Sequence, residues 1–132
     1  MNKTTISQHF RELQLHICSA LEQLDGHAIF NEDTWEREEG GGGHTRTLQG
    51  GRILEKAGVA FSAVHGPVTP AMKQQLGHEG EVFFATGVSI VLHPRHPRHP
   101  IMHMNVRYFE LEDQTFIRPS CFLKSCTRMS YY

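Results

Sequence analysis

The stretch VFFATGVSIVLHPRHPRHPIMHMNVRYFEL, residues 82–111, carries the strongest structural pattern of the chain. Residues 82–93 and 101–111 are rich in β-branched and aromatic side chains, which predicts two β-strands. Residues 94–100 between them contain three prolines, and a proline nitrogen has no hydrogen to donate to a strand ladder. The stretch therefore predicts two antiparallel strands joined by a loop, a β-hairpin.

Side chains alternate between the two faces of a strand, so odd and even positions of this hairpin belong to different faces. The apolar face, expected on the core, carries Val88, Ile90, Leu92, Met102, Met104, Val106 and Tyr108. The other face carries Ser89, Val91, His93, His103, Asn105 and Arg107. If the loop is centred on Pro97, Ser89 lies opposite Asn105 and Val91 opposite His103. The polar residues then gather on one side.

This polar face has the residue types of a binding or catalytic site. Arg107 offers a fixed set of N–H donors that suits a carboxylate. Ser89 and Asn105 add neutral hydrogen-bonding groups, and the imidazoles of His93 and His103 can transfer protons or hold a metal. A solvated sheet face often alternates in the same way, but it usually favours Lys, Glu and Thr. The composition of this face therefore favours a functional site.

The chain contains ten histidines, and three of them repeat every third residue from the end of the first strand into the loop. A polyproline II segment repeats every three residues, so His93, His96 and His99 would line one edge of it. Arg95 and Arg98 lie between them and would oppose a metal cation. We therefore interpret His96 and His99 as loop surface and keep His93 as a site residue.

Outward from the hairpin, the pattern changes from strand to helix towards the N-terminus. Apolar residues recur at spacings of three and four over residues 4–24, which indicates an amphipathic helix. Thr4 or Thr5 can cap its start, and Gly26 suits its end. With the strands, this helix predicts an α+β fold.

Between the helix and the hairpin, the sequence predicts shorter elements. Strands are expected over about 44–49 and 52–57, joined by a tight turn at a pair of glycines, with a further apolar stretch over 58–66. A single helical turn is expected near 71–76. The four glycines of 40–43 fit either a flexible linker or a place where another group approaches the backbone closely.

The composition indicates one globular domain of 132 residues. Its 13 basic and 14 acidic residues leave no general field for polyanions, so nucleic-acid binding is not expected. No apolar run is long enough for a membrane span. Three cysteines and no visible targeting signal favour a reducing compartment, which predicts the cytoplasm with the mitochondrion as the alternative.

Two longer stretches carry specific motifs. Residues 35–66 read WEREEGGGGHTRTLQGGRILEKAGVAFSAVHG, and residues 85–109 read ATGVSIVLHPRHPRHPIMHMNVRYF. With its tryptophan, glycine run, double glycine, VHG and GVS-to-NVR hairpin in this order, the chain resembles the N-terminal part of the oxygen-dependent coproporphyrinogen III oxidases. The resemblance covers roughly residues 5–112. It implies an antiparallel sheet flanked by helices, with the hairpin in its middle.

The resemblance also implies an activity. The family converts two propionate side chains of coproporphyrinogen III to vinyl groups by oxidative decarboxylation, which yields protoporphyrinogen IX in haem biosynthesis. Molecular oxygen is the oxidant and no organic cofactor is needed, while the need for a divalent metal is left open. A homodimer is the family-type assembly.

Site residues follow from the same resemblance, position by position. The implied substrate contacts are Ser89, Asn105, Val106 and Arg107. His103 matches the proton donor of the family, and His93 and His103 match its proposed metal ligands. Arg46 is expected to line the pocket together with the glycine run, where small residues let a flat macrocycle approach the backbone.

The resemblance stops near residue 112. The family continues with an aromatic segment and a GGG-x-DLTP motif, whereas residues 113–132 read DQTFIRPSCFLKSCTRMSYY. We therefore expect a truncated chain, with residues 1–112 as the N-terminal part of the oxidase-like domain, a divergent tail and impaired activity. One rival hypothesis is a non-catalytic fragment that binds porphyrinogen or pairs with another subunit. The other rival is a histidine-rich metal-binding protein.

Overall fold

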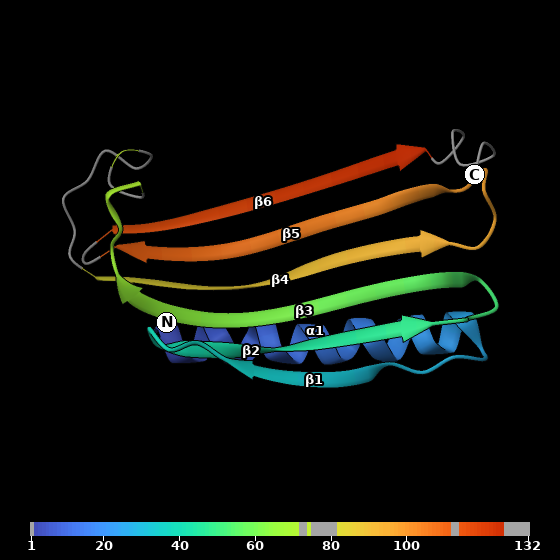
Figure 1. The fold of residues 1–132 in the computed structure, drawn as a ribbon, viewed down its shortest axis with the longest axis horizontal. Coiled ribbons are helices and arrows are strands. Elements are labelled where there is room, and N and C mark those ends of the chain that lie inside the picture. Colours follow the sequence, from blue (N-terminus) through green and yellow to red (C-terminus); the bar gives the residue numbers. More distant parts are fainter. Residues whose placement is uncertain (1, 72–73, 75–81, 112–113, 126–132) are drawn as a thin grey trace.

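The computed structural model describes residues 2–71, 74, 82–111 and 114–125. Its elements, in chain order, are α1 (Lys3–Asp25), β1 (Asn31–Glu36), β2 (Gly41–Gln49), β3 (Leu54–Pro67), β4 (Val82–Pro94), β5 (Pro100–Leu111) and β6 (Gln114–Ser125). Within these residues the strands form one six-stranded sheet in the order β1-β2-β3-β4-β5-β6, and every neighbouring pair is antiparallel (Figure 1). The predicted α+β fold with an antiparallel sheet is confirmed.

The N-terminal helix α1 forms where the apolar periodicity predicts it. Asn2, not Thr4 or Thr5, caps the helix, because its side-chain oxygen accepts a hydrogen bond from the Thr5 nitrogen at 2.8 Å. Gly26 ends the helix as predicted, in a left-handed conformation with φ of 72°. The prediction is therefore confirmed for the helix and its C-terminal end. It is wrong for the N-cap, which lies two residues before the earlier of the two predicted positions.

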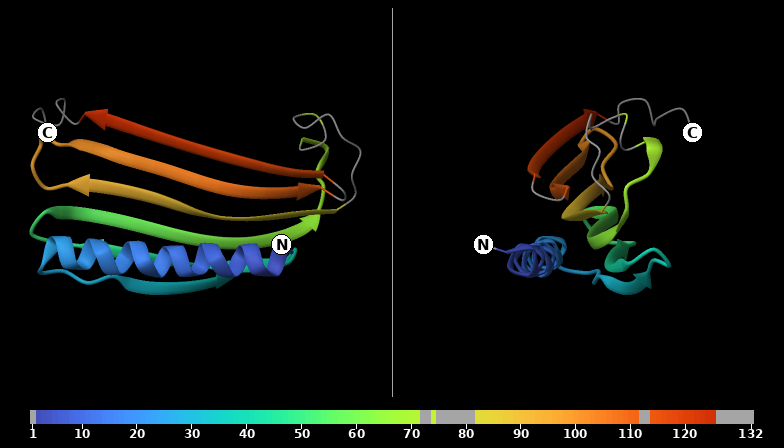
Figure 2. Two further views of the ribbon diagram at one scale, coloured as in Figure 1. Left: turned by 180° about the vertical axis from the view of Figure 1, so that it is seen from behind. Right: turned by 90° about the vertical axis from the view of Figure 1, so that its left-hand side faces the viewer.

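Helix α1 packs against one face of the sheet, chiefly over β3 and β4 (Figure 2). The core between them contains Cys18, Phe30, Leu48, Leu54, Ala57, Val59, Phe61, Val88 and Ile90. We call the side of the sheet that carries this core the helix face, and the other side the open face. A second, smaller cluster of Phe83, Ala85 and Leu111 is buried at one end of the open face.

The segment before the hairpin contains more strand than the sequence predicts. β1 was not predicted, β2 begins at Gly41 rather than near residue 44, and the stretches 52–57 and 58–66 form the single strand β3. The flexible-linker interpretation of the glycine run is wrong, because Gly41, Gly42 and Gly43 pair with β3. A Cβ on Gly41 would lie 2.3 Å from the Ala63 oxygen, so the strand requires glycine there.

The predicted turn at the double glycine joins β2 to β3. Gly50 has φ of 66°, a conformation that glycine adopts without strain. Asp25, buried at the end of α1, accepts backbone hydrogen bonds from Arg52, Ile53 and Leu54 at 2.8–3.0 Å. The turn is thereby fixed to the helix.

Two further findings complete the fold. The helical turn expected near 71–76 falls largely outside the described residues. In the described part of the chain, no helix combines the length and the apolar character that crossing a bilayer requires.

Candidate functional site

β4 and β5 pair in the register expected for the hairpin. Ser89 lies opposite Asn105, and Val91 lies opposite His103. Ile90 is buried in the core under α1, so its neighbours along β4 point to the open face. The predicted division of the hairpin into an apolar and a polar face is confirmed.

The polar residues of the hairpin thus share the open face, on two neighbouring strands. We call Ser89, His93, His103, Asn105 and Arg107 the polar cluster. All except Arg107 are half-buried, and Arg107 is exposed. Where side chains are described, in residues 2–71, 74 and 82–111, no ion pair includes Arg107. Its guanidinium suits an anionic ligand.

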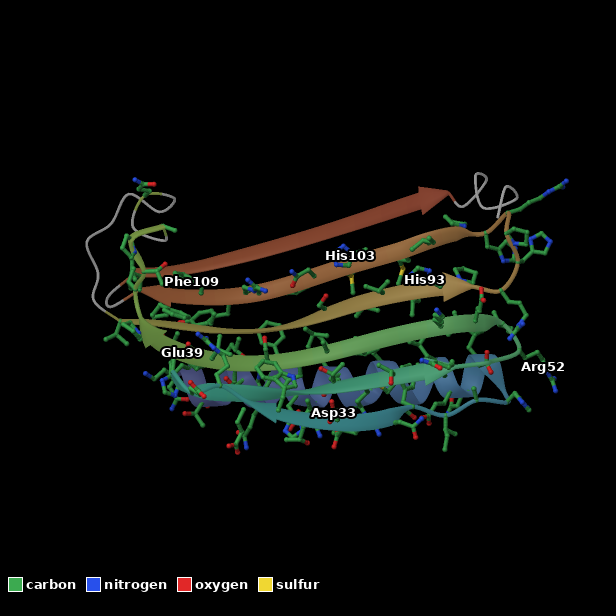
Figure 3. All side chains as sticks on the ribbon, viewed as in Figure 1. Asp33, Glu39, Arg52, His93, His103 and Phe109 are labelled. Atoms are coloured by element: carbon green, nitrogen blue, oxygen red, sulfur yellow. The ribbon has the colours of Figure 1, made fainter. Side chains whose placement is uncertain are left out.

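The two histidines of the cluster can supply only part of a metal site. His103 is opposite Val91, so His93, two residues further along β4, is its diagonal neighbour (Figure 3). Diagonal positions of an antiparallel pair are about 7–8 Å apart. Within the described residues no three His, Cys, Asp or Glu side chains form a metal-binding group. Since a closed zinc site has four ligands, these two imidazoles need further ligands from elsewhere.

Small residues cover the open face beside the polar cluster. The register aligns one row across β2, β3, β4 and β5, namely Gly43, Ser62, Gly87 and Arg107. The next row is Thr45, Ala60, Ser89 and Asn105. We call Gly43, Thr45, Ala60, Ser62 and Gly87 the platform; Ser89 at its edge belongs to the polar cluster. Short side chains let a flat ligand lie close to the backbone, with the polar cluster at its edge.

Two residues predicted for the site point away from this platform. Val106 lies opposite Val88 and shares its orientation towards the helix face. Arg46 lies opposite Val59, which is buried under α1, and is therefore also on the helix face. The structure does not bring the side chains of Val106 and Arg46 together with the polar cluster.

Arg46 belongs instead to a charged group between α1, β1 and β2. Its Nε lies 3.7 Å from Glu32 Oε1 and is buried without a hydrogen-bond partner among the described atoms. Arg11 of α1 donates to the same Glu32 oxygen at 2.7 Å. This hydrogen bond, with the positive charge of Arg11, holds the pKa of Glu32 below its ordinary value against the opposing effect of burial. The group ties the helix to the edge strand.

The buried Cys18 thiol lies near this charged group. Burial raises the pKa of Cys18, and the Arg46 guanidinium partly opposes that rise. A thiol with a raised pKa is a poor nucleophile at neutral pH. Cys18 therefore serves the core.

From the sequence, the glycine run was expected beside the macrocycle, but the rest of the platform on β3 and β4 was missed, and so was a role for Trp35, which lies beside the platform on β1. Trp35 lies opposite Gly43, and its Nε1 donates a hydrogen bond to Thr45 Oγ1 at 3.2 Å. Finding them needed the register of β1 with β2 and of β2 with β3. The available signal was the glycine run that follows Trp35, and it fitted a flexible linker as well as a place where another group approaches the backbone closely.

Comparisons with known proteins agree with the family resemblance of the sequence. The family model described as "Coproporphyrinogen III oxidase" matches residues 5–123. An oxygen-dependent coproporphyrinogen-III oxidase of Prochlorococcus marinus is 46% identical over 111 residues, which are 83% of this chain and 32% of that protein. The mitochondrial protein of this name from Mus musculus is 46% identical over 120 residues, 84% of this chain and 27% of that protein.

A third similar protein is the oxygen-dependent coproporphyrinogen-III oxidase of Prochlorococcus marinus subsp. pastoris. It is 52% identical over 101 residues, which cover 75% of this chain and 30% of that protein. The chain thus spans about a third or less of the length of these curated relatives.

Proposed function

The chain belongs to the coproporphyrinogen III oxidase family, and from this premise we propose that its platform and polar cluster bind coproporphyrinogen III for oxidative decarboxylation. The observation that supports this most is the register of β4 with β5, which puts Ser89, Asn105 and Arg107 at one edge of a surface of small residues. Coproporphyrinogen III combines a broad apolar body, four pyrroles joined by methylene bridges, with four anionic arms. The platform suits the body, and the edge suits the arms.

The proposed roles follow from the chemistry of each side chain. Arg107 binds a propionate with its guanidinium, and Ser89 and Asn105 add neutral hydrogen bonds. Any contribution of Val106 comes from its main chain, since its side chain lies on the helix face. The role of Arg46 as a pocket residue stays a prediction. Its side chain lies on the helix face, on the other side of the sheet from the platform.

The reaction proposed for each propionate is a two-electron oxidation coupled to loss of CO2. A C–H bond of the carbon next to the pyrrole breaks, and the bond to the carboxylate also breaks. One vinyl C=C bond forms, and molecular oxygen with two protons takes up the two electrons as hydrogen peroxide. His103 is proposed as the group that transfers the proton, because an imidazole can donate and accept near neutral pH. No step is assigned to a metal.

Three further elements of the proposal concern cofactors, assembly and location. Oxygen is the proposed oxidant, as the names of the relatives state for those proteins. A divalent metal on His93 and His103 would need ligands beyond these two side chains. A homodimer is proposed for the full-length form, and the cytoplasm for the location, although the Mus musculus relative is named as mitochondrial.

The test is a titration of the chain with coproporphyrinogen III without oxygen, followed by addition of oxygen and chromatography of the products. Binding followed by a vinyl product supports the oxidase function for this chain. Binding without a vinyl product restricts the chain to the non-catalytic, porphyrinogen-binding alternative. Absence of binding contradicts the proposal.

One observation in the β4–β5 loop favours the histidine-rich metal-binding alternative. The exposed rings of His96 and His99 lie 4.9 Å apart between their centroids in the β4–β5 loop. His96 Nδ1 already accepts a hydrogen bond from the Arg98 nitrogen at 3.2 Å, which a metal at that atom would have to break. Zinc binding that vanishes in the double variant His96→Ala/His99→Ala, and survives in His93→Ala/His103→Ala, would favour this alternative over the oxidase.

A further inference from the structure

We propose that Trp35 forms the second edge of the platform and positions the tetrapyrrole on the side opposite Arg107. The inference rests on the proposed function, because it assumes that the platform holds the macrocycle. It assigns a positioning role to a residue on β1, four strands along the sheet from Arg107 and outside the polar cluster.

The first support is the alignment of Trp35 with Arg107 across the sheet. The paired residues run from Trp35 to Gly43, to Ser62, to Gly87 and to Arg107. These positions are separated by four inter-strand steps of about 4.8 Å, or roughly 19 Å along the sheet. The three residues between them have at most a hydroxymethyl side chain. Trp35 and Arg107 are thus the two large side chains that end one row of small ones.

The second support is the fixed orientation of the indole. Trp35 Nε1 donates to Thr45 Oγ1 at 3.2 Å, and Thr45 is itself a platform residue. A Cβ on Gly43 would lie 2.6 Å from Trp35 Cζ2, so the ring packs directly onto the Gly43 backbone. The side chain is half-buried rather than free in solvent. An indole held in this way presents an aromatic surface to a ligand with little loss of entropy on binding.

The third support is the difference in charge between the two edges. Arg107 and the two histidines lie on the β4–β5 side, whereas Asp33 lies beside Trp35 on β1, opposite Thr45. Figure 3 shows Asp33 on the β1 edge of the sheet, away from His93 and His103. Arg37, two residues beyond Trp35, also reaches the open face, where its guanidinium lies 5.9 Å from the centre of the Phe83 ring, but it forms an ion pair with Glu39 at 3.6 Å. Asp33 repels propionates beside Trp35, and Arg107 attracts them at the other edge. We therefore expect the macrocycle to turn its propionates towards Arg107 and an apolar margin towards Trp35.

Trp35 also reports on its own site, since it is the single tryptophan of the chain. Coproporphyrin III, the stable oxidised form of the macrocycle, is the probe. Its binding is followed by its own absorbance band and by Trp35 emission. We expect bound coproporphyrin III to shield the indole from acrylamide, whereas a tryptophan with a purely structural role would not be shielded.

Three variants separate positioning from folding. Trp35→Ala is expected to weaken coproporphyrin III binding about tenfold, the scale of one stacked aromatic contact. Trp35→Phe keeps an aromatic ring and is expected to restore most of the affinity. Thr45→Val removes the hydrogen-bond acceptor at nearly constant volume and is expected to lie between them. Circular dichroism and thermal melting of each variant show whether it is folded.

The outcomes distinguish this inference from the function on which it rests. If Arg107→Ala weakens binding while Trp35→Ala, folded, binds as the unchanged chain does, the role of Trp35 is wrong and the proposed function stands. If Trp35→Ala does not fold, acrylamide shielding of Trp35 in the unchanged chain decides, and its absence overturns the inference. If the unchanged chain binds neither coproporphyrin III nor, without oxygen, coproporphyrinogen III, both proposals are wrong.

Discussion

Gly87 and Gly58 both lie on the open face, but the space beside their α-carbons differs. A Cβ on Gly87 would lie 2.3 Å from the Val106 oxygen and 2.9 Å from the Arg107 α-carbon, both backbone atoms that cannot simply rotate away. A Cβ on Gly58 would meet no atom within 4 Å. We expect Gly87→Ala to lower the free energy of unfolding by about 1–3 kcal/mol, and Gly58→Ala to change it by less than about 1 kcal/mol.

Urea unfolding followed by circular dichroism measures both glycine variants under the same conditions. Gly58→Ala serves as the control for the loss of glycine flexibility, because both substitutions stiffen the unfolded chain equally. Equal stabilities of the two variants would contradict the close backbone approach between β4 and β5 at Gly87.

Arg107 gives a second prediction for a single side chain. If its guanidinium holds a propionate, Arg107→Ala should weaken coproporphyrin III binding by about 1–3 kcal/mol. Arg107→Lys keeps the charge but loses the paired donors, so its affinity should fall between those of Arg107→Ala and the unchanged chain. Equilibrium titration at two salt concentrations measures this, since an ion pair at an exposed residue weakens with salt. Unchanged affinity in Arg107→Ala would remove Arg107 from the site.

Single residues of the polar cluster could be placed from the sequence because the hairpin is local. Parity along two strands and a symmetric loop suffice to put Ser89 beside Asn105. Arg46 could not be placed in this way, because its face depends on the register of β2 with β3 and on which side α1 packs. To place Trp35, the register of β1 with β2 is needed as well. The glycine run in β2 has no side chains whose alternation could predict that register.

At the scale of elements, Asp25 joins the end of α1 to the β2–β3 turn. Backbone N–H groups of Ala28 and Leu54, followed by those of Arg52 and Ile53, hold the pKa of its carboxyl far below the ordinary value, against the effect of burial. A pKa lowered by folding contributes stability that is present above the unfolded value of about 3.9 and is lost as the pH falls through the folded value.

We therefore expect Asp25→Asn to lower the melting temperature at pH 7 and to lose this disadvantage progressively below about pH 4. The measurement is the melting temperature of both proteins between pH 7 and the lowest pH at which they fold. Asp33→Asn, at an exposed position of β1, is the control and should change stability little. A constant difference between the Asp25→Asn protein and the unchanged chain at all pH values would contradict the role of the charge.

Whole elements also differ in how well the sequence predicts them. α1 and the two strands of the hairpin have strong periodicity, and all three form as predicted. β1 reads NEDTWE, a polar segment with little strand propensity, and pairs only because β2 offers an edge. β3 was divided in two at Gly58, yet glycine is tolerated there because pairing with β2 and β4 continues on both sides.

Over the whole molecule, helix α1 contacts some strands of the sheet more than others. The helix packs chiefly on β3 and β4, and the Arg11 guanidinium links it to Glu32 of the edge strand β1. Amides that need global unfolding to exchange should therefore concentrate in β3 and β4, because both strands are paired on two sides and lie under the helix. Amides of β1 should exchange faster, by local opening of the edge.

Native-state hydrogen exchange of the unchanged chain and two leucine variants tests this distribution. Leu21 packs against the core, whereas Leu24 of the same helix is 60% exposed. Leu21→Ala should lower the protection of β3 and β4 together, by about 2–4 kcal/mol, because it opens a cavity between helix and sheet. Leu24→Ala should leave it nearly unchanged. If β1 amides proved as protected as those of β3, or if both variants acted alike, the contact of α1 would not be what stabilises the middle of the sheet.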